Sequence, residues 1–229
     1  VDESRCKGCR LCSEKCPTTV QNEFEADLHY RKAIYIPFPQ AVPAIATIDE
    51  NACLYLSKGG ICRVCQRFCP AGAIDFDQRE QEVSIQASSI IVATGYELLD
   101  PSLFTQYGAG RSPDVLSSLQ YERMMNAAGP TEGKIARISD NSKPERVLFI
   151  QCVGSRSEKP KREPYCSQVC CMYATKQAIV TKEHEPDIDV NMLYNDLRVS
   201  GKGYQALLDR AEEEFKVKFL KGLPGEVQR

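Results

Sequence analysis

The sequence has little of what several common functions require. It contains only two histidines, His29 and His184, so we expect neither a catalytic triad nor a histidine-rich metal site, and we expect both side chains at the surface. No stretch approaches the roughly eighteen apolar residues of a membrane-spanning helix. The net charge is −2, without a long run of Lys and Arg, which argues against nucleic acid or an anionic membrane as partner. We also expect no signal peptide.

Cysteine, in contrast, is abundant, and eight of the twelve cysteines form two N-terminal groups. The first group has the spacing C-x2-C-x2-C-x3-C-P, which is typical of bacterial ferredoxins. The second differs by a wider first gap, filled by a loop over residues 54–61. Zinc sites usually use paired C-x2-C motifs, and disulfide frameworks suit short secreted chains. The spacing therefore predicts two [4Fe–4S] clusters. The groups are Cys6, Cys9, Cys12 and Cys16, and Cys53, Cys62, Cys65 and Cys69.

The last cysteine of each group is predicted to serve the other cluster. In two-cluster ferredoxins the cysteine before the proline is turned away from its own group and ligates the second cluster. Pro17 and Pro70 favour extended geometry at the preceding cysteine. The predicted ligand sets are Cys6, Cys9, Cys12 and Cys69 for one cluster, and Cys53, Cys62, Cys65 and Cys16 for the other.

The chain is predicted to have three parts and to belong to a longer protein, since it begins with Val1 rather than methionine. Residues 1–80 form an α+β ferredoxin-like module, with an edge strand over Val42–Ile48 and a closing strand over Ala73–Gln78. Residues 81–143 begin with an alternating and then apolar pattern over 83–92, which predicts a central strand of a covered sheet.

Ala93, Thr94 and Gly95 follow that predicted strand. An Ala-Thr-Gly turn after a strand is similar to a motif of two-dinucleotide-domain flavoproteins, where the backbone approaches FAD closely. We therefore predict a contact with FAD at these three residues. Further along, a helix is expected over Val115–Ala128, before the stop signal Gly129-Pro130.

From residue 144 to 229 strands and helices alternate. Strands are predicted over 146–152, 188–194 and 217–220, and helices over 167–183 and 204–215. Alternation of this kind predicts a parallel, Rossmann-like α/β sheet. The glycine-rich loop G-x-G-x-x-G is missing after the first strand, where Cys152-Val-Gly-Ser-Arg156 stands instead. We therefore expect a degenerate dinucleotide site here.

The remaining cysteines lie in this third part, and their spacing alone leaves three interpretations open. Cys166 and Cys170 are one helical turn apart and can face one point, which allows an unusually ligated third cluster. A redox-active dithiol is the second interpretation. Small buried thiols that fill a helix–sheet interface are the third. The four residues are Cys152, Cys166, Cys170 and Cys171.

Several segments together resemble the A subunit of heterodisulfide reductase. They are Ile91-Val-Ala-Thr-Gly95, Gly129-Pro-Thr-Glu-Gly133, Gln151-Cys-Val-Gly-Ser-Arg156 and Tyr165-Cys-Ser-Gln-Val-Cys-Cys-Met-Tyr-Ala174 followed by Lys176-Gln177. In that family a thioredoxin-reductase-type flavoprotein fold is interrupted by a two-cluster ferredoxin. The resemblance implies that the chain is an internal portion of such a protein. It also favours a third [4Fe–4S] cluster at Cys152, Cys166, Cys170 and Cys171.

The resemblance implies an iron–sulfur flavoprotein oxidoreductase of methanogenesis, with FAD bound in the full-length protein. Reduced thiolates imply a cytoplasmic setting. The oxidoreductase would pass single electrons between FAD and clusters, with flavin-based electron bifurcation in some members. Its implied partners are the B and C subunits of heterodisulfide reductase, a hydrogenase or formate dehydrogenase, and ferredoxin. The family's FAD-binding glycine loop is not in this sequence, so we expect this chain alone to be inactive. The alternative is a non-catalytic electron-transfer or docking subunit without its own flavin.

Overall fold

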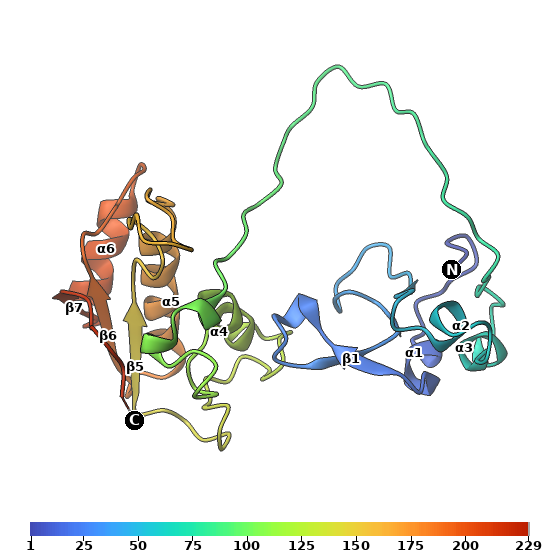
Figure 1. Ribbon diagram of the computed structural model, residues 1–229, viewed down its shortest axis with the longest axis horizontal. Coiled ribbons are helices and arrows are strands. Elements are labelled where there is room, and N and C mark those ends of the chain that lie inside the picture. Colours follow the sequence, from blue (N-terminus) through green and yellow to red (C-terminus); the bar gives the residue numbers. More distant parts are fainter. Residues whose placement is uncertain (229) are drawn as a thin grey trace. The chain divides into compact units, whose positions relative to one another are not determined.

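The computed structural model describes residues 1–228 and divides into two compact units, Val1–Gly95 and the chain from Tyr96 onward. Figure 1 follows the chain through both units, and each is described by itself. Among the described residues, every helix is too short or too polar to cross a bilayer.

The first unit consists of short helices and two small antiparallel sheets. Its elements are α1 (Leu11–Lys15), β1 (Thr19–Gln21), η1 (Glu23–Glu25), β2 (Tyr30–Lys32), β3 (Ile34–Tyr35), β4 (Thr47–Ile48), α2 (Leu54–Ser57) and α3 (Val64–Phe68). Strands β1 and β2 pair with Val20 opposite Arg31, and β3 and β4 pair with Ile34 opposite Ile48. The mixture of helices and strands in this unit agrees with the predicted α+β class.

Cysteine side chains form part of the hydrophobic core of the first unit. Helices α1 and α3 pack against each other, and each contributes one buried cysteine, Cys12 and Cys65. The remaining buried members of this core are Ile34, Ala46 and Ile74. A core this small buries little apolar surface, so the thiols lie where larger domains place aliphatic side chains.

Two strands predicted in the first unit were wrong or too long. Only Thr47–Ile48 of the segment Val42–Ile48 is a strand, because Pro43 has no amide to donate and its carbonyl accepts from Ile45 N–H in a turn. No strand forms over Ala73–Gln78. The Ala73 amide donates to the Cys69 sulfur instead, and the Asp75 carboxylate accepts from the Asp77 amide in a local turn.

The predicted central strand over 83–92 is also absent. Residues 81–100 contain neither helix nor strand, and their apolar side chains face solvent, with Val83 77% and Ile91 90% exposed. A strand buried on both faces needs neighbouring strands and covering helices. Residues 1–228 bring no strand against this segment, so its alternating pattern has nothing to pair with.

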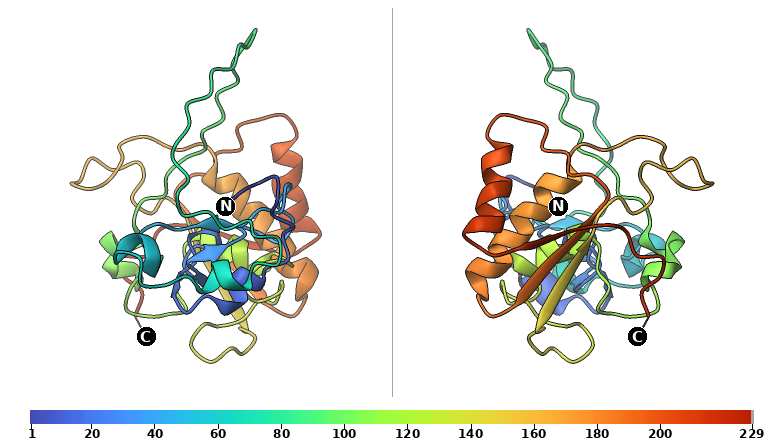
Figure 2. Two further views of the ribbon diagram at one scale, coloured as in Figure 1. Left: turned by 90° about the vertical axis from the view of Figure 1, so that its right-hand side faces the viewer. Right: turned by 90° about the vertical axis from the view of Figure 1, so that its left-hand side faces the viewer.

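The second unit is built around a three-stranded parallel sheet. Its elements are η2 (Pro101–Leu103), η3 (Thr105–Tyr107), α4 (Ser118–Met125), β5 (Arg146–Ile150), α5 (Cys170–His184), β6 (Asp189–Tyr194), α6 (Tyr204–Glu213) and β7 (Lys218–Lys221). The strand order is β5-β6-β7, and both pairings are parallel. Helices α5 and α6 lie side by side against this sheet (Figure 2). The predicted alternation of three strands with two helices is confirmed.

One face of this sheet and three helices enclose the core of the second unit. Phe149, Met192 and Phe219 lie in register on neighbouring strands and face the helices. Helix α4 adds Tyr121 and Met124 to the same core. Residues 96–143 and 144–228 therefore pack together in one unit.

Helix α4 is shorter than the predicted Val115–Ala128 because its start is fixed by a capping box. The Ser117 hydroxyl accepts from the Gln120 amide at 3.2 Å, and the Gln120 side chain accepts from the Ser117 amide at 2.9 Å. The helix ends at Met125, before Gly129-Pro130 as the stop signal requires.

Candidate metal centres

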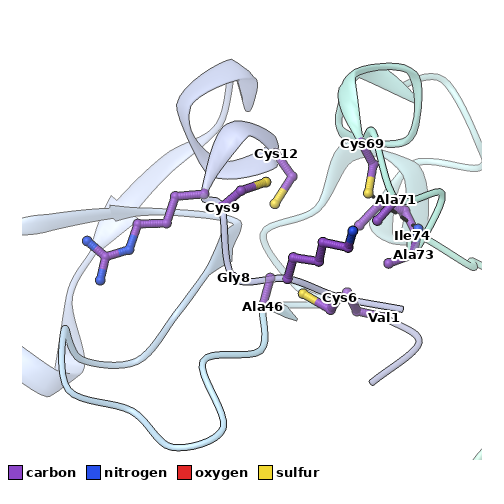
Figure 3. Close-up of a pocket in the computed structure, with 12 residues that line it drawn as sticks. Val1, Cys6, Gly8, Cys9, Cys12, Ala46, Cys69, Ala71, Ala73 and Ile74 are labelled. Atoms are coloured by element: carbon purple, nitrogen blue, oxygen red, sulfur yellow. Dashed lines mark hydrogen bonds between the residues drawn. The ribbon is translucent and has the colours of Figure 1, made fainter. Parts of the chain in front are cut away.

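Four cysteines of the first unit line one small hollow, here called cavity one. Cys6, Cys9 and Cys12 come from the N-terminal loop and α1, and Cys69 comes from the end of α3. Figure 3 shows Cys6, Cys12 and Cys69 around this hollow, with Cys9 beside Cys12. The other lining residues are mostly apolar and include Val1, Ala46, Ala73 and Ile74.

The other four N-terminal cysteines line a second hollow, here called cavity two. Cys53 precedes α2, Cys62 precedes α3, Cys65 lies within α3, and Cys16 follows α1. Aliphatic side chains such as Ile34 complete the wall.

The division of the eight thiols between the cavities follows the crossed pattern that the spacing predicts. Helix α1 carries Cys12 at cavity one and is followed by Cys16, which lines cavity two. Helix α3 carries Cys65 at cavity two and is followed by Cys69, which lines cavity one. Each helix thus contributes to both hollows. The role of these thiols as iron ligands stays a prediction.

The surroundings of the thiols suit an iron–sulfur cluster. Burial raises the pKa of the Cys12 thiol, and burial raises the pKa of Cys65 to about 11. Such thiols lose their protons readily only next to a compensating positive charge, which iron supplies. The Ala73 amide donates to the Cys69 sulfur at 3.3 Å, the kind of hydrogen bond that stabilises a thiolate in a cluster. Residues 1–228 contain no group of three His, Cys, Asp or Glu side chains arranged for a single metal ion.

Gly8 lets the backbone close cavity one. Its φ of +65° lies in the left-handed region, and a Cβ at this position would stand 2.5 Å from the Ala44 carbonyl oxygen. The loop that contains Ala44 leads to Ala46, which lines the cavity. A side chain at position 8 would therefore push this loop away from the thiols.

Three of the four cysteines in the second unit interact electrostatically with one another. Cys152 follows β5 with a φ of +57°, while Cys170 and Cys171 open helix α5. A hydrogen bond from Cys171 lowers the pKa of Cys170 to about 6. Burial raises the pKa of Cys152, and the nearby Cys170 adds to this effect. The Cys171 sulfur also accepts from the Arg198 amide at 3.4 Å.

Cys166 differs from these three in its hydrogen bonding. Its sulfur accepts from the Gln168 amide at 3.4 Å, within its own loop. Beside Cys152, Arg156 forms an ion pair of 2.9 Å with Asp196. The structure thus brings Cys152, Cys170 and Cys171 together, while the hydrogen bond of Cys166 is local.

The residues predicted to meet FAD lie in exposed, irregular chain. Ala93, Thr94 and Gly95 are all exposed, and Gly95 has a φ of +73° with open space where a Cβ would stand. Their role as FAD contacts stays a prediction. His29 and His184 are exposed, as expected.

Sequence reasoning missed two basic residues at cavity one. Lys7 and Arg10 each follow a cysteine of the first group, and both line the cavity. Their positions directly after Cys6 and Cys9 were the available signal.

Comparisons with known proteins agree with this geometry. The 4Fe-4S binding domain family matches residues 1–20. The chain is 45% identical over 227 residues to the A subunit of the H(2):CoB-CoM heterodisulfide,ferredoxin reductase of Methanothermobacter thermautotrophicus, covering 99% of this chain and 33% of that protein. It is 47% identical to the first of two iron-sulfur A subunits of the CoB–CoM heterodisulfide reductase of Methanopyrus kandleri, covering 99% and 34%.

A third relative is the A subunit of the Ferredoxin/F(420)H(2)-dependent CoB-CoM heterodisulfide reductase of Methanosarcina acetivorans, with 43% identity, covering 99% of this chain and 28% of that protein. The chain spans about a third of the length of the curated relatives it matches. Along nearly all of its own length, the chain is thus a homologue of the A subunits of the heterodisulfide reductases, which are oxidoreductases.

Proposed function

We propose that this chain carries single electrons through two [4Fe–4S] clusters, one in each cavity, within a heterodisulfide-reductase-type oxidoreductase. The observation that supports this most strongly is the lining of each cavity by four thiols. When bound, a cluster accepts or donates one electron without a change in its ligands. The protein's part is to hold the thiols, exclude water with apolar walls and supply amide donors.

A third cluster is proposed for the second unit. The proximity of Cys152, Cys170 and Cys171, at the end of a strand and the start of a helix, supports it. Cys166 is proposed as the fourth ligand on the resemblance. A redox-active pair of Cys170 and Cys171 remains the competing proposal, supported by the lowered pKa of Cys170.

The wider role is proposed from the resemblance and from the names of the relatives. We propose residues 1–80 as the inserted ferredoxin module, 81–143 as part of an FAD-binding domain, and 144–229 as a Rossmann-like domain with a degenerate dinucleotide site. FAD, electron bifurcation and the B and C subunits belong to this proposal. The relatives' names mention H2, formate, ferredoxin and F420H2, which supports a hydrogenase or formate dehydrogenase and ferredoxin as partners. A cytoplasmic location is proposed with them.

The second candidate is an electron-transfer or docking part without its own flavin. The exposure of Ala93, Thr94 and Gly95 and the lack of a strand before them favour this role for the chain taken alone. A flavin absorption spectrum of the anaerobically purified chain separates the two candidates. Bound FAD supports the first, and iron without flavin supports the second.

Iron and acid-labile sulfide measured per chain test the cluster proposal. Two clusters require about eight irons and three require about twelve, at four irons each. The variants Cys69→Ser and Cys16→Ser should each remove a different electron paramagnetic resonance signal. A colourless, zinc-containing or disulfide-linked protein would contradict the proposal.

A further inference from the structure

The two cavities differ in the basic residues beside them, although the cysteines of the two groups correspond one by one. Aligning the groups makes Lys7 correspond to Leu54 and Arg10 to Arg63. Lys7 and Arg10 both line cavity one. Leu54 lines cavity two, and no Lys or Arg is among the residues around that cavity in the described chain.

Arg63 explains why a basic residue in the second group leaves cavity two uncharged. Its guanidinium donates to the Tyr55 hydroxyl at 2.8 Å and lies 4.9 Å from the centre of the Tyr55 ring. Arg63 does not line the cavity. The corresponding Arg10 borders cavity one, but its side chain is exposed and its guanidinium points away from the cysteines (Figure 3), so Lys7 is the cation that distinguishes cavity one.

The hydrogen bonds of Cys69 and Cys16, the two cysteines that line the cavity of the other group, also favour negative charge at cavity one. At cavity one the Ala73 amide donates to the Cys69 sulfur at 3.3 Å. The corresponding cysteine at cavity two, Cys16, has its sulfur 3.8 Å from the Thr18 carbonyl oxygen. An amide donor stabilises extra negative charge on sulfur, whereas a carbonyl oxygen can only accept a hydrogen bond.

Exposure to solvent differs as well. Each cavity has one buried cysteine, Cys12 or Cys65, and the difference lies in Cys9, which is exposed at cavity one while the other three cysteines of cavity two are half-buried. Reduction adds a negative charge, which nearby cations, amide donors and water all stabilise. The three differences therefore act together and favour reduction at cavity one.

We infer that the cluster site in cavity one has the higher reduction potential of the two, with Lys7 as the residue that raises it. This inference rests on the proposed occupation of both cavities by clusters. An electron entering the ferredoxin module then moves from cavity two, where the site is oxidised, to cavity one, where the site is reduced. The site in cavity two loses one electron and the site in cavity one gains it, and no bond is made or broken and no proton moves.

Redox titration of the iron-loaded protein, followed by electron paramagnetic resonance, tests the inference. We expect two midpoint potentials for the module. Lys7→Gln should lower the ratio of reduced to oxidised protein at the higher-potential signal by about threefold, and Arg10→Gln, whose exposed side chain points away from the thiols, should lower it less. The threefold change is about 28 mV, since tenfold corresponds to 59 mV for one electron. The lower-potential signal should not move.

Two further variants complete the design. Lys58→Gln removes an exposed cation that lines neither cavity, and it should move neither signal. Leu54→Lys places a cation at the position in cavity two that corresponds to Lys7, and it should raise the lower potential. If Leu54→Lys loses iron, the shift measured for Lys7→Gln decides whether the inference holds.

Two results would overturn the inference. One is that Lys7→Gln lowers the potential of the lower signal instead. The other is that Lys7→Gln shifts neither signal, with the iron content unchanged. Both differ from failure of the proposed function, in which the parent protein itself would contain fewer than about eight irons.

Discussion

The cysteines of the two units are held in different ways. In the first unit they are part of a small hydrophobic core, with Cys12 and Cys65 buried where α1 meets α3. In the second unit they lie at the edge of a sheet whose core is made of aliphatic and aromatic side chains. Bound iron–sulfur clusters would therefore complete the hydrophobic core of the first unit, whereas the second unit has a hydrophobic core without a cluster.

Removal of iron is therefore expected to affect the two units very unequally. Without clusters the first unit keeps only two short sheets and a small core, so its amides should exchange at least about tenfold faster. Amides of β5 and β6 should keep their protection. Hydrogen exchange with mass spectrometry, before and after anaerobic chelation, measures both. Equal loss of protection in both units would contradict the comparison.

Substitution of single cysteines in the second unit tests whether that unit also holds a cluster. If Cys171 ligates a third cluster, Cys171→Ser should lower the iron content by about four per chain. Cys166→Ser should have the same effect if Cys166 closes the site. Iron quantitation with sulfide analysis checks both variants. Loss of iron in neither variant would favour the Cys170–Cys171 dithiol, which thiol titration would then detect.

Gly154 offers a test of how rigidly the second unit holds the loop after Cys152. A Cβ there would stand 2.3 Å from the Phe104 ring and 2.7 Å from Leu99, at a φ of +72°. Gly154→Ala should lower the free energy of unfolding by about 2–4 kcal/mol through overpacking and backbone strain. Gly225→Ala, with open space around it, is the control and should change little. Urea denaturation measures the free energy of unfolding of both variants. Equal values would show that the loop moves to accommodate the added methyl group.

The smallest expected effect concerns pH and the core of the second unit. Burial raises the pKa of Tyr121 to about 12, and its hydroxyl lies 2.8 Å from the Thr181 hydroxyl. The raised pKa means that this contribution to stability is complete below about pH 10 and declines as pH rises towards 12. Between pH 9 and pH 11 the loss should be about 1 kcal/mol. Tyr121→Phe should remove this part of the pH dependence, and an unchanged slope would contradict the assignment.

The sequence predicted those features that depend on local spacing. Three cysteines three residues apart can point at a common centre only from a tight loop, and the cysteine before the proline is turned away from that centre. The division of the eight thiols between the two cavities could therefore be predicted. The helices and strands from Arg146 to Lys221 agree with the predicted alternation of apolar strand segments and helical segments, and α6 shows the helical period most clearly. Boundaries were less predictable, and α4 begins three residues later than expected because Ser117 caps it.

Features that depend on distant partners could not be predicted. The alternation of polar and apolar residues over 83–92 indicates that the segment is able to join a sheet. It does not indicate whether a neighbouring strand is present. Ala73 similarly has strand-like neighbours, yet its amide is taken by the Cys69 sulfur. The charges at cavity one were missed because the cysteine spacing gives no orientation for the side chains of Lys7 and Arg10.

The sharing of α1 and α3 between the cavities has a consequence for how the module matures. Because each helix presents thiols in two directions, fixing Cys16 at one centre also fixes the position of Cys12 at the other. We expect insertion of the first inorganic core to preorganise the pocket for the second. Half-filled molecules should then be scarce during reconstitution, with empty and doubly filled chains making up nearly all of the population.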